Sequence, residues 1–352
     1  SMDVEFSNGA TRIYERLMSR GNGAVLVIPM LDDDTVLMIY EFSGGTERYE
    51  LGLTKGKIDK GETPIEAAGR ELKEEIGFFA EVPIYDPKTK EEDKRRNEYA
   101  DIFWNSRQRR GISLLDSQKW MRERNYFAAM MVNQGHADAM VSGYSRSYAS
   151  IIKPILQLIE KAPGISLVAT TNMMMTNRGP MFLSDTAINP NPSADDLAKI
   201  ALMTAKTVRM FGIEPVIAMI SFSNFGSSSN PSTNKVRDAV KFLHDNHPEL
   251  QVDGEIQADF ALNSDMLKTK FPFSKLAGKK VNTLIFPNLE SANITYKLLK
   301  ELYKVDSIGP IMLGMDKPVH IFQLGASVEE MVNMVAVAVV DAQEKEKRNR
   351  IK

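Results

Sequence analysis

Two kinds of hydrophobic pattern follow one another along the chain. The first eighty residues hold short apolar runs, "GAVLVIPML" and "TVLMIYEF", on either side of the polar segment Asp32–Asp34. Apolar runs that flank a polar turn predict an antiparallel hairpin. A loop rich in glycine and lysine is expected over 49–61. A helix is expected from about Thr63 to Ile76, because Pro64 suits a first helical turn.

From about Val82 the pattern changes to helices that alternate with short, wholly apolar strands. Such strands between helices are typical of a largely parallel sheet that is covered on both faces. The expected helices span 91–110, 114–125, 149–161, 194–211, 233–246 and 294–302, followed by a capped helix from 328 to about 345 and a frayed or solvated basic tail. The expected strands span 138–143, 165–171, 215–222, 281–287 and 319–324. We therefore predict an α/β protein with an antiparallel β plus helix segment over 1–80 and a larger domain over 81–352.

Composition narrows the classes of protein but points to none. The 352 residues are 43% hydrophobic and 26% charged, with a net charge of −2, so nothing marks a nucleic-acid binder. The absence of cysteine excludes disulfide scaffolds, thiolate metal sites and thiol nucleophiles. No apolar run approaches the ~20 residues that a membrane span requires. We expect a cytoplasmic protein that acts on or binds small molecules, without a membrane or nucleic-acid partner.

Three carboxylates are expected on one helix face near the end of the first segment. Glu71, Glu74 and Glu75 stand at positions i, i+3 and i+4 of "RELKEE". Clustered like charges destabilise a helix unless a cation compensates, and Mg²⁺ prefers carboxylate oxygens. Taken alone, the same six residues favour a solvated helix rich in Glu and Lys over a metal site.

The wider spacing around this helix resembles a complete Nudix box, G-x5-E-x7-R-E-U-x-E-E-x-G-U. The matching residues are Gly56, Glu62, Arg70, Glu71, Leu72, Glu74, Glu75, Ile76, Gly77 and Phe78. With its flanks, the segment 6–78 resembles the front half of a bacterial ADP-compound hydrolase of that superfamily. The resemblance implies hydrolysis of ADP-ribose-like pyrophosphates, with Mg²⁺ held by Glu71, Glu74 and Glu75 and with Arg70 orienting them. The strands that would complete a Nudix fold do not follow Gly77.

The rest of the chain resembles the phosphate acetyltransferase domain, and most closely the version that bacterial NADP-dependent malic enzymes carry at their C-terminus. The matching segments are 82–87, 107–111, 124–132, 135–143, 179–192, 221–227, 253–259, 282–297 and 323–334. The resemblance implies a two-lobed αβα fold related to isocitrate and isopropylmalate dehydrogenases. It places the proximal lobe in 81–145 and 315–352, and a distal lobe that forms a homodimer in 146–314.

Several residues are candidates for binding a phosphate or a CoA thioester. The loop with Ser221, Ser223 and Asn224 follows an apolar strand and precedes a helix, so its N–H groups could cradle a phosphate. An ordinary Ser/Gly connector explains that loop equally well. The other candidates are Ser142 and Gly143 at a strand end, with Arg146 and Lys153 downstream as anion partners. The acids at 253, 255 and 259 could form a metal cluster, but a structural loop is preferred.

Departures from the active transferases decide the predicted function. Those enzymes carry a Ser-Arg pair that helps to bind the acyl phosphate and orient the thiol, and an acid that assists thiol deprotonation. Here these positions correspond to Gln323, Leu324 and Glu330. Leucine cannot pair with a phosphate. A further family arginine corresponds to Lys153, whereas another is retained as Arg107.

The Gln-Leu variant resembles the malic-enzyme fusions, in which the domain binds acetyl-CoA as a regulatory ligand. Our leading hypothesis is therefore an acetyl-CoA-binding regulatory domain without acetyl transfer. The alternatives are a Mg²⁺-dependent hydrolase of ADP-ribose-like compounds and a structural chimera with neither activity. The sequence looks chimeric, because the Nudix-like segment stands where the opening elements of the transferase domain would be.

Overall fold

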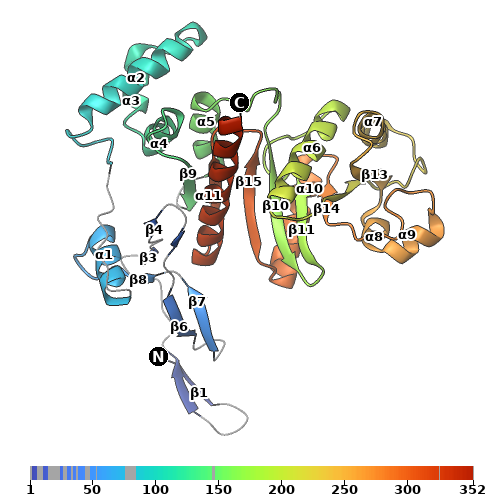
Figure 1. Cartoon of the computed structure of the whole chain (residues 1–352), viewed down its shortest axis with the longest axis horizontal. Helices are drawn as coiled ribbons and strands as arrows, with labels where there is room; N and C mark the ends of the chain where they lie inside the picture. Colours follow the sequence, from blue (N-terminus) through green and yellow to red (C-terminus); the bar gives the residue numbers. More distant parts are fainter. Residues whose placement is uncertain are drawn as a thin grey trace. The chain divides into compact units, whose positions relative to one another are not determined.

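The computed structural model describes residues 2–5, 11–14, 24–26, 30–32, 35–36, 39–43, 48–52, 54–75, 85–144, 147–324 and 326–351. The chain divides into two compact units, Ser1–Tyr85 and Asp86–Lys352 (Figure 1). The expected junction at 80–82 lies outside the described residues. None of the described helices is long and apolar enough to cross a membrane.

The described strands of the first unit pair two by two, and all four pairs are antiparallel. The pairs are β1 (Met2–Glu5) with β2 (Thr11–Tyr14), β3 (Ala24–Leu26) with β8 (Lys55–Lys57), β4 (Met30–Asp32) with β5 (Thr35–Val36), and β6 (Ile39–Ser43) with β7 (Arg48–Gly52). The predicted pairing across Asp32–Asp34 is confirmed. The loop expected over 49–61 instead contains β8 and most of β7. Several glycine and lysine residues of this segment therefore take part in strand pairing.

Helix α1 (Pro64–Glu75) follows β8 and begins where the sequence predicts. Thr63 caps it: the Thr63 backbone N–H donates to the Glu66 carboxylate at 2.8 Å, and the Glu66 N–H donates to the Thr63 hydroxyl at 3.3 Å. This reciprocal capping box satisfies two backbone donors that a helix start leaves unpaired.

The second unit contains a helical layer packed on a short parallel strand pair. Its elements are α2 (Asp93–Arg107), α3 (Leu114–Trp120), α4 (Arg124–Asn133), β9 (Met140–Tyr144), α5 (Tyr148–Leu158), β16 (Val319–Leu324) and α11 (Val328–Ile351). Strands β9 and β16 pair in parallel, so their carboxyl ends lie together. Tyr99, Phe103, Phe127 and Ile151 are fully or almost fully buried in the core between α2, α4 and α5.

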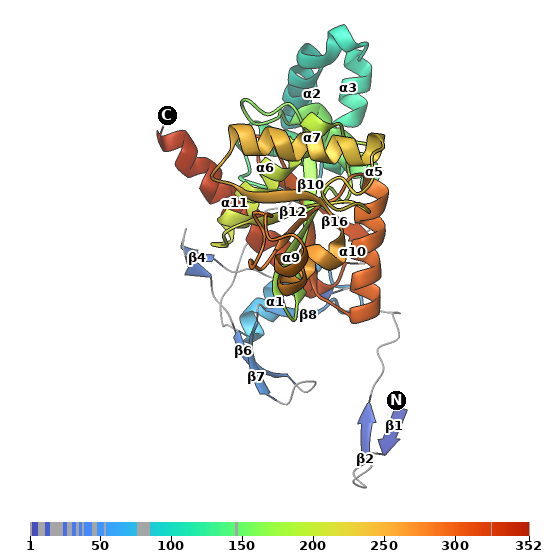
Figure 2. The same cartoon turned by 90° about the vertical axis from the view of Figure 1, so that its right-hand side faces the viewer.

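A six-stranded mixed sheet forms the remainder of the second unit, in the order β13-β12-β14-β11-β10-β15. The strands are β10 (Ala169–Thr176), β11 (Gly179–Ser184), β12 (Val216–Ile220), β13 (Gln251–Ile256), β14 (Thr283–Ile285) and β15 (Ser307–Leu313). One core packs α6 (Ala194–Met210) and α7 (Pro231–Asn246) on the sheet. A separate core packs α8 (Ala258–Leu262), α9 (Ser264–Lys270) and α10 (Leu289–Tyr303) on it. Figure 2 shows these two groups of helices on opposite sides of the sheet.

The α/β class is as predicted, but the largely parallel sheet is a correction. Strand β10 runs antiparallel to both of its neighbours, β11 and β15, so the sheet is mixed. Strands β11 and β15 were not predicted, since Pro180 and Pro310 break their apolar runs.

Two helical predictions also need correction. The helix expected over 114–125 ends at Trp120, and a separate helix, α4, begins at Arg124. The expected frayed tail instead continues α11 to Ile351. Ion pairs at helical spacing, Lys345 with Asp341 at 2.7 Å and Lys347 with Glu344 at 3.2 Å, stabilise these last turns.

Candidate functional site

The carboxyl ends of β9 and β16 bring several predicted residues together. Ser142 lies opposite Ile321 in the parallel ladder, and its hydroxyl donates to Asn125 Oδ1 at 2.7 Å. Gly143 has φ +144°, and a Cβ there would lie 2.6 Å from the carbonyl oxygen of Phe322. Only glycine allows this approach of the strands. Ser142 and Gly143 therefore lie beside the segment that leads into Gln323.

Gln323 is engaged within the protein. Its Nε2 donates a hydrogen bond to the hydroxyl of Tyr296, which comes from α10. Tyr296 is 2% exposed, and burial raises the pKa of its phenol, so the hydroxyl stays neutral. The side chain of Leu324 lies outside the described residues.

Both carboxylate oxygens of Glu330 are also engaged. Lys300 of α10 pairs with Oε1, and the backbone N–H of Ser327 donates to Oε2 at 2.8 Å. The Glu330 N–H in turn donates to the Ser327 hydroxyl at 3.1 Å, which completes a capping box at the start of α11. A cavity of about 10 Å³ remains beside these residues, about enough for one water. It is lined by Lys300, Ser307, Gly309, Phe322, Gln323, Ala326 and Glu330.

The basic residues that were predicted to bind an anion are not found together at the carboxyl ends of β9 and β16. Arg107 lies at the end of α2 and donates to the carbonyl oxygen of Gln157 at 2.5 Å, so it caps the end of α5. Burial and the nearby Arg110 lower the pKa of Arg107. Lys153 places its ammonium 5.6 Å from the centre of the Trp120 ring. Arg146 lies outside the described residues.

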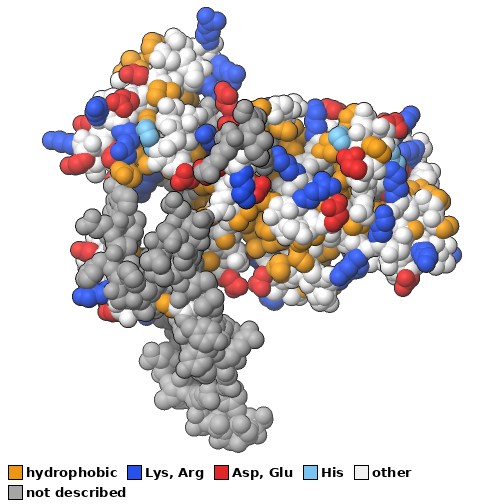
Figure 3. Space-filling model, in the orientation of Figure 1, with side chains coloured by type: hydrophobic (Ala, Val, Ile, Leu, Met, Phe, Trp, Pro, Cys, Tyr) orange, Lys and Arg blue, Asp and Glu red, His pale blue; other side chains and the backbone are white. Residues whose placement is uncertain are grey.

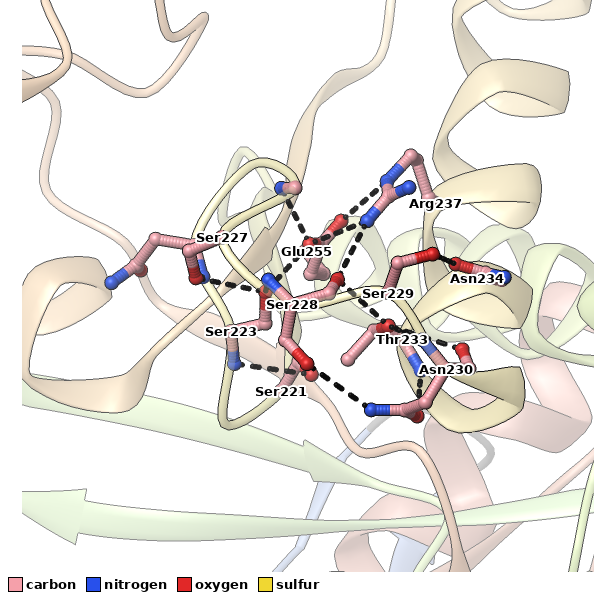
Figure 4. Close-up of polar contacts among 12 residues, drawn as sticks. Ser221, Ser223, Ser227, Ser228, Ser229, Asn230, Thr233, Asn234, Arg237 and Glu255 are labelled. Carbon is pink, nitrogen blue, oxygen red and sulfur yellow. Dashed lines mark hydrogen bonds and ion pairs between the residues drawn. The ribbon is translucent and has the colours of Figure 1, made fainter.

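The serine-rich loop 221–230 joins β12 to α7 and is built around one buried carboxylate (Figure 4). Glu255 is fully buried and accepts hydrogen bonds from Arg237 Nε and Nη2, both at 3.1 Å. It also accepts from the Gly226 N–H at 2.7 Å and from the Ser223 hydroxyl at 2.9 Å. Burial acts to raise the pKa of Glu255, but these hydrogen bonds prevail and the pKa is lowered.

The N–H groups of this loop already donate within the protein. Six successive donors, those of residues 223 to 228, bond to protein oxygens. Asn230 then caps α7, accepting from the N–H groups of Ser232 and Thr233. Glu255 and the serine hydroxyls therefore hold the loop without a ligand, and a bound phosphate would have to compete with them. Within the described residues, no hydrogen bond or ion pair joins Ser221, Ser223 or Asn224 to Gln323 or Glu330.

Of the acids considered as a metal cluster, Asp253 has structural partners, as Glu255 does. Asp253 accepts from the Ser274 hydroxyl and from the Lys275 N–H, both at 2.8 Å. Across the described part of the chain, no group of three or more acidic or histidine side chains is placed to hold a metal ion.

In the first unit, Arg70 organises the acidic face of α1. Its guanidinium donates to both oxygens of Glu62, at 3.0 and 3.1 Å, and to Glu71 Oε1 at 2.6 Å. It also reaches Glu74 at 3.4 Å. A Cβ on Gly56 would lie 1.8 Å from the carboxyl carbon of Glu71, so a larger residue at this position of β8 would have to displace the Glu71 carboxylate.

Among the described residues, Glu71 and Glu74 contact the guanidinium of Arg70, and no three carboxylates are placed to hold Mg²⁺. The side chain of Glu75 lies outside the described residues.

Sequence reasoning missed Tyr296, Lys300 and Arg237, the partners of Gln323, Glu330 and Glu255. All three are distant from their partners along the chain. Tyr296 and Lys300 stand at i and i+4 of one helix and share a face, which is the only signal that the local pattern offers.

Comparison with known proteins places the second unit. The family described as Phosphate acetyl/butaryl transferase matches residues 61–339. A phosphate acetyltransferase of Clostridium acetobutylicum is 37% identical over 299 residues, covering 83% of this chain and 88% of that protein. An NADP-dependent malic enzyme of Escherichia coli is 36% identical over 303 residues, covering 84% of this chain but 39% of that protein.

Solved structures agree on the fold. A phosphotransacetylase from Streptococcus pyogenes superposes with a TM-score of 0.68 at 36% identity, over 79% of this chain and 84% of that one. An ADP compounds hydrolase is 52% identical over 23% of this chain and 43% of its own, with a TM-score of 0.17, which supports no statement about fold.

Proposed function

The chain belongs to the phosphate acetyl/butaryl transferase family, and from this premise we propose that it binds acetyl-CoA as a regulatory ligand without transferring the acetyl group. Transfer to phosphate needs a cation for the acyl phosphate and a base for the thiol. The resemblance assigns these tasks to positions that hold Gln323, Leu324 and Glu330 here.

One observation carries the proposal: both carboxylate oxygens of Glu330 are already engaged within the protein. Lys300 pairs with one oxygen and the Ser327 N–H holds the other. The ion pair and the cap hydrogen bond fix this carboxylate at the start of α11, so it would have to leave or share these partners to reach a thiol. Gln323, bonded to Tyr296, can orient a ligand but supplies no charge.

The names of some relatives support a regulatory role. Malic enzymes of Escherichia coli and Haemophilus influenzae match over 39% and 34% of their lengths, so the similar region is a minor part of each. A domain attached to a separate catalytic region can act only through ligand binding once its own chemistry is lost. Several other relatives are named phosphate acetyltransferase, so activity must be measured directly.

The test has a binding arm and a turnover arm. We expect calorimetry with the full chain to give saturable acetyl-CoA binding that is tighter than that of free CoA. We also expect no thioester formation from acetyl phosphate and CoA. Turnover by the unmodified chain would overturn the proposal, and so would absence of acetyl-CoA binding. In the double variant Gln323→Ser/Leu324→Arg, a gain of turnover would show that these two positions caused the loss.

We infer in addition that the chain forms a homodimer through the lobe that contains α10. Ile294, Leu298 and Leu302 recur every four residues on α10 and are 56%, 53% and 72% exposed. A stripe of this kind is typical of an interface. Light scattering should give twice the chain mass, and Leu298→Glu/Leu302→Glu should give the monomer. A monomeric unmodified chain would contradict the dimer.

A second candidate function is hydrolysis of ADP-ribose-like pyrophosphates, for which Mg²⁺ would supply water activation and charge screening. The close approach of Gly56 to Glu71 and the Arg70 pairs with Glu62 and Glu71 favour it, because box residues distant in sequence are brought together. AMP release from ADP-ribose in saturating Mg²⁺ would support this function, and no release would exclude it.

A further inference from the structure

A cavity of about 370 Å³ lies between α6, β15 and the last turns of α11. Figure 1 shows β15 between these two helices. The volume falls within the range of about 300–1,000 Å³ that is typical of small-molecule sites. None of the residues assigned above to acetyl-CoA lines it.

One side of the cavity is apolar and adaptable. Its apolar lining consists of Ala162, Ile165, Met203, Met210, Ile311, Met312, Leu313 and Met315. Methionine side chains are flexible and polarisable, so a floor that contains four of them can adjust to the shape of an apolar ligand. Figure 3 shows, on one face of the second unit, hydrophobic side chains that lie among Lys and Arg side chains.

The rim of the cavity carries a small excess of positive charge. Lys206, Arg209 and Lys345 line it, against Asp341 and Glu344. Each carboxylate has a cation of its own: Lys345 Nζ lies 2.7 Å from Asp341, and Lys347 Nζ lies 3.2 Å from Glu344. Arg209 also pairs with Glu214 at 3.2 Å on the outside. Lys206 also has an interaction within the protein, so a ligand would share these cations, and a single negative charge suits the rim better than a phosphate dianion.

A buried histidine stands behind this rim and fixes it. His320 is fully buried, and its Nδ1 accepts a hydrogen bond from the Met312 N–H at 3.3 Å. In the neutral ring Nε2 then carries the hydrogen, and it faces Asp341 Oδ2 at 3.5 Å. Burial acts to raise the pKa of Asp341, but His320 and Lys345 lower it. His320 and Lys345 thus hold Asp341 ionised in the wall, which sets the net charge that a ligand meets.

We propose that this cavity binds a small organic monocarboxylate with an apolar body. The carboxylate lies against Lys206 and Arg209, and the apolar body lies on the methionine floor. Charge-assisted contacts to ammonium and guanidinium groups supply the head-group recognition, and burial of the apolar body supplies the rest of the affinity. This site is separate from the proposed acetyl-CoA site and does not depend on it.

Octanoate is a suitable probe, and octan-1-ol is its uncharged counterpart. Calorimetry with the full chain should show one saturable site for octanoate and binding about tenfold or more weaker for octan-1-ol, because the head group loses its charge-assisted contacts. Equal affinities would mean that the cavity is a simple apolar hollow, and would overturn the proposal. Absence of saturable heat with octanoate would overturn it as well.

Matched variants on one helix place the site. Lys206→Gln, which removes a lining charge, should weaken octanoate binding by about fivefold or more. Lys199→Gln, which removes an exposed lysine of α6 that does not line the cavity, should leave binding unchanged. An equal loss in both variants would mean non-specific attraction and would contradict the site. Saturating acetyl-CoA should not displace octanoate, and displacement would mean that the two ligands share one site.

Discussion

Each of the two units contains an arginine that pairs with acidic side chains, several around Arg70 and one around Arg237, and the two clusters differ in burial. Arg70 holds Glu62 and Glu71 near the surface, with side chains 29%, 15% and 12% exposed. Arg237 is 40% exposed, but the Glu255 carboxylate it holds is fully buried. Desolvation makes an unpaired buried charge far more costly than an exposed one. The Glu255 cluster is therefore needed for folding whatever the protein does, whereas the Arg70 cluster is not.

Because of this difference in burial, the two clusters differ in value as evidence for function. Residues that keep a loop folded persist with or without activity, so the serine loop is weak evidence for phosphate binding. Residues in a near-surface cluster contribute little to stability. The Nudix-like box can therefore be tested by substitution without unfolding the chain, and the serine loop cannot.

The largest effect is expected at the buried carboxylate. Glu255→Ala leaves Arg237 without its bidentate partner and removes the acceptor of the Gly226 N–H and of the Ser223 hydroxyl. We expect the free energy of unfolding of the second unit to fall by about 3–5 kcal/mol. Urea unfolding followed by circular dichroism measures it.

Glu214→Gln is the control for this substitution, because it breaks an exposed pair with Arg209. Its effect should stay within about 0.5 kcal/mol. A loss below about 1 kcal/mol for Glu255→Ala would show that the loop does not depend on the buried charge, and the contrast between the clusters would fail.

Acid should weaken the second unit through the same carboxylate. The pKa of Glu255 is lowered from its usual 4.5 in the folded protein, so its stabilising effect is complete above the unfolded value and is lost as the pH falls through the folded one. Between about pH 5 and pH 3 the unmodified chain should lose stability more steeply than Glu255→Gln, which has no proton to gain. Parallel profiles in urea titrations would contradict this assignment.

A smaller effect is expected in the first unit at Gly56. Gly56→Ala places a methyl group where the Glu71 carboxylate lies, and this carboxylate is the free end of a flexible side chain. The side chain can move away, so we expect a cost of about 1 kcal/mol, the lower end of the range for overpacking. The loss of stability should be measurable as faster amide hydrogen exchange in peptides from α1.

Gly69→Ala is the matched change within α1, because a Cβ there meets nothing within 4 Å. Alanine in a helix interior should stabilise α1 by about 0.5–1 kcal/mol and slow its exchange. Equal changes at both glycines would mean that the contact with Glu71 does not constrain this segment.

The local sequence pattern predicted the bounds of helices and strands well where its signals were strong. It predicted them poorly where tertiary packing determines the structure. Strand β16 was predicted residue for residue over 319–324, and α6 and α7 to within two residues at each end. Helix α4 was missed because "RNYFAAMMV" buries Phe127, Ala129 and Met130 and has no clear polar face. The strand predicted over 165–171 corresponds to β10, but its antiparallel direction was not predicted, because strand direction depends on long-range pairing and not on the apolar run itself.

The candidate site was predictable only in part, for the same reason. The strand-end residues Ser142 and Gln323 could be placed together from a parallel-sheet pattern. The partners that engage Gln323 and Glu330 could not be predicted. The Gln323–Tyr296 bond and the Glu330–Lys300 pair join residues that are about thirty positions apart in the sequence. Residue types at a spacing predict what a side chain can do, but not which partner engages it.

The smallest effect on stability is expected at Glu74, where the comparison between the clusters is sharpest. Glu74 is 60% exposed and lies 3.4 Å from Arg70, so Glu74→Gln should change the unfolding free energy by at most about 0.5 kcal/mol. If the chain hydrolyses ADP-ribose, the same substitution should abolish AMP release, because it removes a carboxylate charge from the box. AMP release that survives in Glu74→Gln would come from elsewhere in the protein. A chain that releases no AMP in either form would leave the Nudix-like box as a surface cluster whose residues serve α1 alone.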